Sequence, residues 1–377
     1  MKFTINSADL LSALSMLNRA QSSKNALPIL DCIRIELLTD GIRLTASDNE
    51  QTLDTKLPVI NPSDIGQTVC VPSAQLLSAL KELPNQPITF MGDDKTYSCR
   101  IDFANGHFNF VAQSDEAFPM PPATLDTPRT LTIPANIFAQ GLSNTRNSIS
   151  NDELRPQMNG VYVDVLSDGN IVFVASDGHS LSRNTFRVSE QETEPFGFIL
   201  PTKTTQILAS LLAKQTEPVT LSVNSTNLII TINGYTLYGR LLEGRYPNYN
   251  SVIPKDNPFN AIVERDALVS AVRRVLVFAS AATALIKFSF TDGALTISAQ
   301  DLDFSTSAEE QVPCEYHQQP VCIGFSGTML IDLLKQLPPT ALNFSFADPS
   351  RPGIIIPTEQ PDDEETLLLL MPMMLKA

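Results

Sequence analysis

The chain has 377 residues, of which 43% are hydrophobic and 18% charged, and its net charge is −15 at pH 7. This length exceeds one ordinary core and predicts two or three domains, with three domains of roughly 125 residues each as the simplest division. The composition excludes a largely disordered chain. The acidic excess argues against a nucleic-acid partner unless the basic residues are segregated.

The first predicted elements are a short strand at residues 3–5 and an amphipathic helix from Asp9 to Ala20. Neither an apolar signal run nor a small-residue cleavage site precedes them, and no apolar run reaches the roughly 18 residues that span a bilayer. We therefore expect a soluble, cytoplasmic protein. Five scattered cysteines without CxxC spacing predict reduced thiols and no disulfide or zinc framework.

The strand and helix that open the chain recur twice at nearly constant spacing. The three strands are Phe3–Ile5, Leu131–Ile133 and Ala261–Val263, and the helices are predicted over 9–20, 136–150 and 265–280. Each copy then carries an Asp-Gly turn between alternating segments, which is typical of a tight β-hairpin. These turns are Asp40-Gly41, Asp168-Gly169 and Asp292-Gly293. The strand after each turn ends on Asp48, Asp177 or Asp301.

A second strand and helix follow in each copy. Apolar residues at i, i+3 or i+4, and i+7 predict helices over 73–83, 203–214 and 328–337. Proline-rich connectors, Pro119–Pro128 and Pro247–Pro258, separate the copies as domain linkers should. The repeat therefore predicts three α+β domains, each with two helices packed on antiparallel sheets, at residues 1–123, 128–250 and 253–377.

The six predicted helices differ in charge from the rest of the chain. Their residues together are slightly net positive, so the remainder is more acidic than the whole. A curved array with helices on one side could close into a ring if two copies met, and a weakly basic lining would suit sequence-independent phosphate contact. The candidates for DNA contact are Lys24, Arg146, Lys203, Arg273 and Arg274. Any one of them alone is better explained as a solvated surface charge, so the layer is better supported than its members.

Ordered motifs over the whole length carry a family resemblance. They are Leu27–Leu30, Met158–Gly160, Ala175–Leu181, Glu243–Tyr249 and Val252–Lys255. On these motifs the chain resembles the β subunit of bacterial DNA polymerase III, the sliding clamp family. The resemblance implies a head-to-tail homodimer, a six-domain ring around duplex DNA that an ATP-driven clamp loader places there. It also implies no catalysis, no cofactor, no metal and no membrane contact.

The resemblance further implies a groove between the second and third domains for a short peptide of the polymerase α subunit or of other proteins with a clamp-binding motif. Its deeper apolar part would use Met158, Ser176, Gly178, His179, Leu181, Pro247, Val252, Leu369 and Met371. Its adjoining part would use Arg155, Tyr316, Pro372 and Met373. A few buried anchors and adaptable methionines suit this task. The chain departs from the family pattern at Pro156, Gln157, Ser180 and Ser251, which leaves the peptide preference open.

Three alternatives stay open at this point. The segment Met371–Met373 could be an ordinary edge strand, and Val277 with Phe278, which the resemblance places at the dimer interface, could be ordinary core. An enzyme could use Asp177 and His179 as an acid/base pair, but three histidines and the lack of HExxH, GxGxxG or a phosphate-binding Gly-Lys loop argue against catalysis. A repeat scaffold that binds proteins and not DNA is only weakly excluded by the charge distribution.

Overall fold

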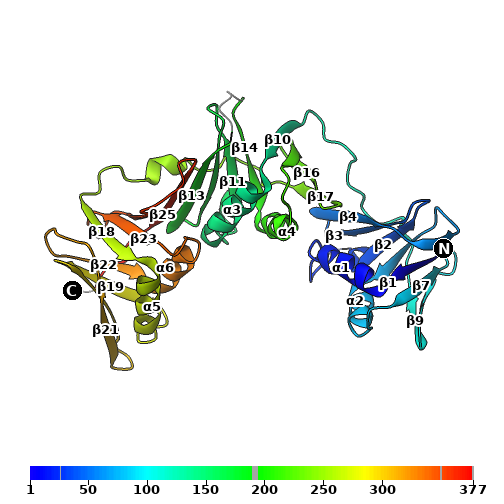
Figure 1. Cartoon of the computed structure of the whole chain (residues 1–377), viewed down its shortest axis with the longest axis horizontal. Coiled ribbons are helices and arrows are strands. Elements are labelled where there is room, and N and C mark those ends of the chain that lie inside the picture. Colours follow the sequence, from blue (N-terminus) through cyan, green and yellow to red (C-terminus); the bar gives the residue numbers. More distant parts are fainter. Residues whose placement is uncertain (26, 189–193, 349, 376–377) are drawn as a thin grey trace. The chain divides into compact units, whose positions relative to one another are not determined.

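The computed structural model describes residues 1–25, 27–188, 194–348 and 350–375. The chain forms two compact units. Unit 1 contains Met1–Ala135 and Gln206–Leu241, and unit 2 contains Asn136–Thr205 and the chain from Leu242 onward. The middle repeat therefore contributes residues to both units (Figure 1).

Unit 1 contains two antiparallel sheets. One has the strand order β5-β1-β7-β8-β9 and the other the order β10-β15-β16-β17-β4-β3-β2-β6. Pairing of β17 with β4, with Leu237 opposite Leu53, joins strands of the first and second repeats. The strands are β1 (Lys2–Asn6), β2 (Cys32–Leu37), β3 (Ile42–Ser47), β4 (Gln51–Leu57), β5 (Ile60–Ser63), β6 (Thr68–Pro72), β7 (Pro87–Gly92), β8 (Ser98–Phe103), β9 (Gly106–Val111), β10 (Arg129–Ile133), β15 (Val219–Val223), β16 (Asn227–Ile232) and β17 (Tyr235–Arg240).

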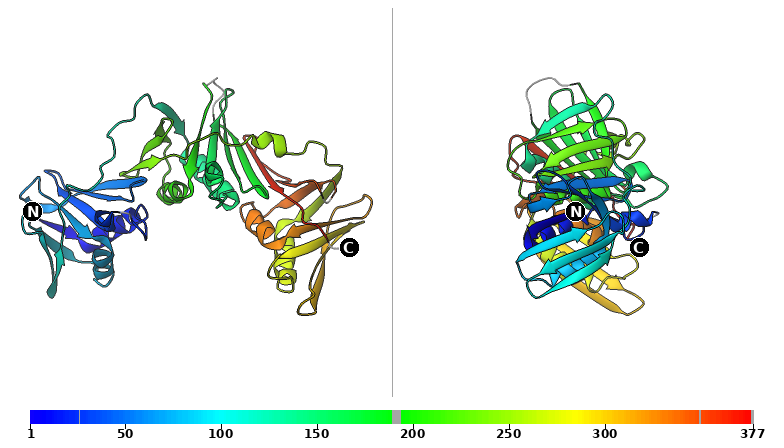
Figure 2. Two further views of the ribbon diagram at one scale, coloured as in Figure 1. Left: turned by 180° about the vertical axis from the view of Figure 1, so that it is seen from behind. Right: turned by 90° about the vertical axis from the view of Figure 1, so that its right-hand side faces the viewer.

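Helices α1 (Ser7–Leu17) and α2 (Ser73–Lys81) lie side by side in unit 1 (Figures 1 and 2). The side chain of Asn6 caps α1 by accepting a hydrogen bond from the Ala8 N–H at 2.9 Å, which satisfies a donor that the first helical turn leaves open. The i, i+4, i+7 spacing of Leu10, Leu14 and Leu17 places all three in the core.

Unit 2 has the same construction. Its sheets have the orders β14-β11-β12-β13-β25-β24-β23-β18 and β21-β20-β19-β22. Pairing of β13 with β25 joins the second repeat to the third. The strands are β11 (Gly160–Val165), β12 (Asn170–Ser176), β13 (Ser180–Arg187), β14 (Phe196–Pro201), β18 (Phe259–Glu264), β19 (Leu285–Thr291), β20 (Ala294–Asp301), β21 (Thr306–Pro313), β22 (Val321–Ser326), β23 (Ala341–Phe346), β24 (Gly353–Pro357) and β25 (Glu364–Leu370).

Helices α5 (Arg265–Leu276) and α6 (Gly327–Leu334) pack together in unit 2 (Figures 1 and 2). Both cover a core that includes Phe288, Phe290 and Phe346. The remaining helices of the chain are α3 (Ala135–Thr145) and α4 (Thr202–Leu212), with short 3₁₀ turns η1 (Pro28–Asp31), η2 (Arg146–Ser148), η3 (Pro156–Met158) and η4 (Tyr249–Val252).

The six helices and the three hairpins occur where the sequence predicts them. The Asp-Gly turns connect β2 to β3, β11 to β12 and β19 to β20. All six helices end two to five residues earlier than predicted, for example α1 at Leu17, α3 at Thr145 and α5 at Leu276, because tighter turns continue the chain beyond each end. No helix in the described part of the chain is long and apolar enough to cross a membrane.

Replacing Gly160 with alanine should destabilise unit 2. A Cβ at Gly160 would lie 2.2 Å from the carbonyl oxygen of Leu200 on the paired strand, and backbone cannot move aside as a side chain can. We expect the free energy of unfolding to fall by about 1–3 kcal/mol, as for other overpacked positions, in denaturant titrations. The matched control is Gly106→Ala, whose nearest neighbour is the Phe103 ring at 3.0 Å. Equal losses in the two variants would contradict this explanation.

Candidate functional site

The turn between β12 and β13 is held by its own side chains. The Ser176 hydroxyl donates to the Ser180 carbonyl at 2.7 Å, and one oxygen of Asp177 accepts from the backbone N–H groups of His179 and Ser180 at 2.8 and 2.6 Å. Gly178 has φ of +88°, a conformation that glycine adopts without strain. Ser176 and Asp177 therefore hold the backbone in place, which removes the basis of the acid/base interpretation.

The end of β25 lies beside this turn. Leu369 is paired with Leu181 of β13, and both side chains are buried. Immediately after the strand, the N–H of Met371 donates to the carbonyl of His179 at 2.8 Å. The Met371 side chain stays about one third exposed at 36%. The predicted groove residues of the second and third repeats thus meet along one strand pair.

The chain then leaves this sheet and pairs with another. Pro372 is half-buried, and the N–H of Met373 donates to the carbonyl of Gly324 on β22 at 2.8 Å. The segment Met371–Met373 is therefore no continuation of β25, because its hydrogen bonds divide between two sheets. Tyr316 lies apart from it, in the core beside Phe290, and its hydroxyl donates to the Gln319 carbonyl at 2.6 Å. The described contacts do not join Tyr316 to the other groove residues.

Leu181 and Leu369 belong to a buried apolar cluster, which forms the floor of the candidate site. Its buried members come from β12, β13, β14, β24, β25 and the segment after β17. They are Val172, Val174, Leu181, Ile199, Tyr246, Tyr249, Ile354, Leu367 and Leu369. Pro247, between the two tyrosines in sequence, and Val252, three residues after them, are exposed, Val252 by 52%. An apolar floor with exposed apolar edges can accept apolar side chains of a ligand.

Three tyrosines hold the 246–249 segment on the sheet. The rings of Tyr246 and Tyr162 stack with centroids 4.9 Å apart and an interplanar angle of 3°. The Tyr249 hydroxyl donates to Asp164 at 2.9 Å. Burial raises the pKa of Asp164, and the hydrogen bonds from Tyr249 and Tyr162 partly offset that effect. These residues were not among the predicted site residues. The Tyr246-Pro-Asn-Tyr249 motif and the alternation of β11 are the sequence features that could have indicated them.

The two remaining groove candidates belong to η3 and the residue before it. Met158 is buried, while Arg155 is exposed and pairs with Asp152 at 2.9 Å. A Cβ on Gly178 would lie 3.0 Å from Nη1 of Arg155. The guanidinium therefore lies over the β12–β13 turn, and glycine leaves room for it.

The predicted DNA-facing residues have different surroundings. Lys24, Arg146 and Arg273 are exposed, and Lys203 is half-buried on α4. Arg274 makes two hydrogen bonds to Glu310 of β21, at 2.9 and 2.5 Å, and this contact lowers the pKa of the Glu310 carboxyl. The charge of Arg274 is thus locally offset, which sequence alone could not show because the two residues lie on separate elements.

The candidate dimer contact is exposed. Val277 and Phe278 follow α5 and are 78% and 41% exposed, so the alternative that they are ordinary core is wrong. Leu302 and Phe304, in the turn between β20 and β21, are 71% and 80% exposed and were not predicted as site residues.

Among the described residues, no group of three or more His, Cys, Asp or Glu side chains could hold a metal ion.

Models of the DNA polymerase III beta subunit match the chain three times in succession. The N-terminal domain model matches residues 1–122, the central domain model 132–248 and the C-terminal domain model 250–374. Among curated relatives, the beta sliding clamp of Caulobacter vibrioides (strain NA1000 / CB15N) is 27% identical over 380 residues, covering 99% of this chain and 100% of the relative. That of Bacillus subtilis (strain 168) is 24% identical, covering 99% of each.

Solved structures resemble the chain over its whole length. A DNA polymerase sliding clamp from Pseudomonas aeruginosa has a TM-score of 0.91 at 23% identity, and a sliding clamp from Bartonella birtlesii bound to griselimycin has a TM-score of 0.91 at 25% identity. Both comparisons cover 100% of each chain. The predicted α+β fold of three repeated clamp domains is confirmed, while its division at 1–123, 128–250 and 253–377 stays a prediction.

Replacing Tyr249 with phenylalanine should destabilise unit 2 in a pH-dependent way. The variant removes a donor that stabilises the ionised Asp164, so we expect the free energy of unfolding to fall by about 1 kcal/mol. The pKa of Asp164 should rise further in the folded state. The loss should therefore be absent while Asp164 is protonated in the folded state, and should grow as pH rises through the folded-state pKa of the carboxyl, which burial holds above its unfolded value.

Chemical denaturation across a pH series measures this effect. The control is Tyr162→Phe, which removes a longer hydrogen bond of 3.4 Å to the same carboxyl and should cost less. A Tyr249→Phe loss that does not change with pH would contradict the idea that the hydroxyl stabilises the ionised form of Asp164.

Proposed function

Because the chain belongs to the DNA polymerase III beta subunit family, we propose that it is a sliding clamp that encircles duplex DNA and tethers the replicative polymerase. The observation that carries this proposal is the ordered match of three clamp domains over nearly the whole chain. A closed ring acts by tethering, since it raises the effective concentration of the polymerase at its substrate without strong DNA affinity of its own. The clamp has no catalytic step and works in the bacterial cytoplasm.

The groove is proposed to bind short linear peptides of the polymerase α subunit, the clamp loader and other partners. Support comes from the buried and paired Leu181 and Leu369, and from the exposed apolar side chains of Met371 and Val252. Apolar pockets of this kind derive most of their affinity from a few buried anchors. The unbranched methionine side chain can adapt to more than one peptide. Tyr316 remains a proposed member through the family motif alone.

Ring closure is proposed to occur between the third domain of one protomer and the first domain of the next. Strands β21 and β9 each end a sheet, and open sheet edges are normally covered in stable proteins. Val277 and Phe278 supply exposed apolar side chains for such a contact. Exposed basic residues, with Arg146 and Arg273 foremost, are proposed to make loose, sequence-independent contacts with phosphates.

The groove assignment predicts that Met371→Ala with Met373→Ala reduces the affinity for polymerase α-subunit peptides by about a hundredfold, the loss typical of strong anchor positions. Fluorescence anisotropy of a labelled peptide measures the affinity, and sedimentation confirms that the dimer persists. The matched control is Met374→Ala, because Met374 is 83% exposed. Unchanged peptide affinity in the double variant would disprove the assignment.

The ring assignment predicts topological retention on DNA. Clamp loaded onto nicked circular DNA should stay bound through gel filtration and should be released once the circle is cut. Phe278→Asp, which places a charge at the proposed dimer contact, should sediment as a monomer and fail to be retained. Retention on the linear form, or a native chain that is a stable monomer at micromolar concentration, would instead favour a scaffold without an encircling role.

A further inference from the structure

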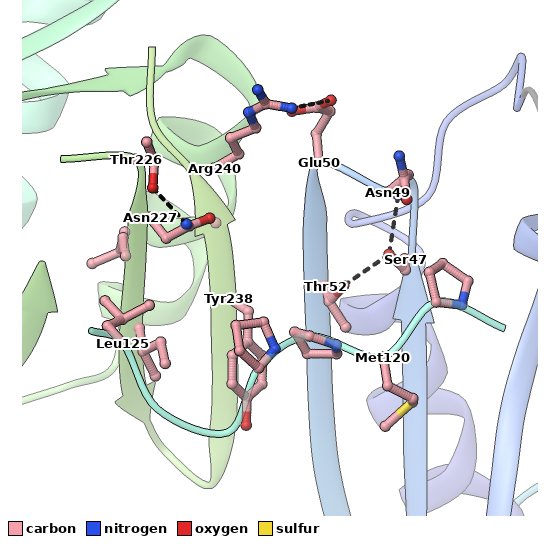
Figure 3. Close-up of a pocket in the computed structure, with 16 residues that line it drawn as sticks. Ser47, Asn49, Glu50, Thr52, Met120, Leu125, Thr226, Asn227, Tyr238 and Arg240 are labelled. Carbon is pink, nitrogen blue, oxygen red and sulfur yellow. Dashed lines mark hydrogen bonds and ion pairs between the residues drawn. The ribbon is translucent and has the colours of Figure 1, made fainter. Parts of the chain in front are cut away.

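A separate pocket lies in unit 1, against a hairpin like the one in the candidate groove. Its volume is about 440 Å³, which falls within the roughly 300–1,000 Å³ typical of ligand sites. Strands β3, β4, β16 and β17 line it, and the connector from Pro119 to Leu125 passes across its front (Figure 3). The connector contributes three prolines and the half-exposed Met120.

The β3–β4 turn repeats the hydrogen bonds of the β12–β13 turn. The Ser47 hydroxyl donates to the Gln51 carbonyl at 3.1 Å, and one oxygen of Asp48 accepts from the Gln51 N–H at 2.7 Å. Asn49 has φ of +77° and occupies the left-handed position that glycine holds in the groove turn. Because asparagine also tolerates this conformation, the two turns share one backbone frame.

The neighbouring strand completes the likeness. The N–H of Arg240, at the end of β17, donates to the carbonyl of Glu50 at 2.9 Å. In the groove, the N–H of Met371 makes the same bond to His179 at 2.8 Å. Strand β17 therefore has the same place beside β4 that β25 has beside β13, and the pocket is the internal-repeat counterpart of the groove.

The side chains on this common frame differ in polarity. Thr52 pairs with Tyr238 where the groove pairs Leu181 with Leu369. The Thr52 hydroxyl lies 2.8 Å from that of the buried Ser47. The pocket thus repeats the backbone frame of the groove, with hydroxyl-bearing side chains in place of its leucine pair.

The rim of the pocket has no excess charge. Glu50 and Arg240 form an ion pair at 3.7 Å, and both side chains are more than half exposed. One charge of each sign gives no attraction for a polyanion such as nucleic acid. The proline wall and Met120 instead offer apolar contact beside the hydroxyl and amide groups of Thr52 and Asn227.

We propose that this pocket is a second peptide-binding site, which takes a short extended segment of a partner protein with an uncharged polar anchor such as Asn, Gln, Ser or Thr. The choice of a peptide rests on the proposed function of the groove, whose backbone frame the pocket repeats. The Thr52 hydroxyl is paired with Ser47 and the Asn227 amide with Thr226, so the second lone pair of the Thr52 oxygen is left to accept from an Asn, Gln, Ser or Thr anchor, whereas a Leu or Phe anchor has no donor to offer it. The chain would then hold two partner segments of different chemistry at once.

The test is a selection with a random peptide library displayed on phage. The target is the full-length chain carrying Met371→Ala and Met373→Ala, so that groove ligands do not dominate. Enriched peptides should share an uncharged polar anchor. Their affinity, measured by fluorescence anisotropy, should fall about tenfold or more when Met120→Arg is added, because an added long side chain obstructs the pocket. Met374→Arg, at another exposed methionine, should leave it unchanged.

Two outcomes overturn the proposal. One is a selection that enriches no peptide above a protein-free control, and the other is enriched peptides that bind the Met120→Arg variant unchanged. A second variant, Thr52→Leu with Tyr238→Leu, installs the leucine pair of the groove and should lose the polar-anchored peptides. Retention of those peptides also overturns the proposal. Failure of the groove assignment is seen separately, in polymerase-peptide binding to the variant that carries only the two methionine substitutions.

Discussion

The pairing of β13 with β25 is the interaction on which the candidate groove depends. It joins strands of different repeats in one hydrogen-bonded ladder, so residues far apart in sequence are held in a register that backbone hydrogen bonds determine. A slip of β25 by one residue against β13 would turn Leu369 to the face of the sheet opposite Leu181. This register determines which side chains form the apolar floor. It also places Met371 beside His179 and positions the apolar cluster on which the Tyr246–Tyr249 segment packs.

The same physical solution operates in unit 1. Strand β17 pairs with β4 in a register that leaves the β3–β4 turn beside the end of β17, as in the groove. Hydrogen bonds from Ser and Asp side chains hold both turns, and these bonds do not depend on what the floor is made of. The frame therefore tolerates either leucines or hydroxyl-bearing side chains, and triplication of one unit could produce sites of different polarity without a change of fold.

Sequence predicted the local features well. The Asp-Gly turns, the amphipathic helices and the repeat itself depend on residues close together, and their patterns are visible without coordinates. Pairings across repeats were not predictable in this way, since many strands share the same alternation. The Arg274–Glu310 contact and the Tyr249–Asp164 bond, each within one repeat, were missed because they join side chains of separate elements. Tyr316 is the opposite case. The family motif assigns it to the groove, whereas its described contacts lie in the core.

The acidic composition and the proposed work on DNA are reconciled by where the charges lie. Tight phosphate contacts would hinder movement along DNA, so the proposed ring needs only a few exposed cations, for which Arg146 and Arg273 are the proposed residues. The offset of Arg274 by Glu310 leaves that residue less charge for such a contact. Topology then supplies the retention that charge does not. In this proposal, apolar side chains make the specific contacts, in the partner groove and at ring closure. The contact with DNA can then remain weak.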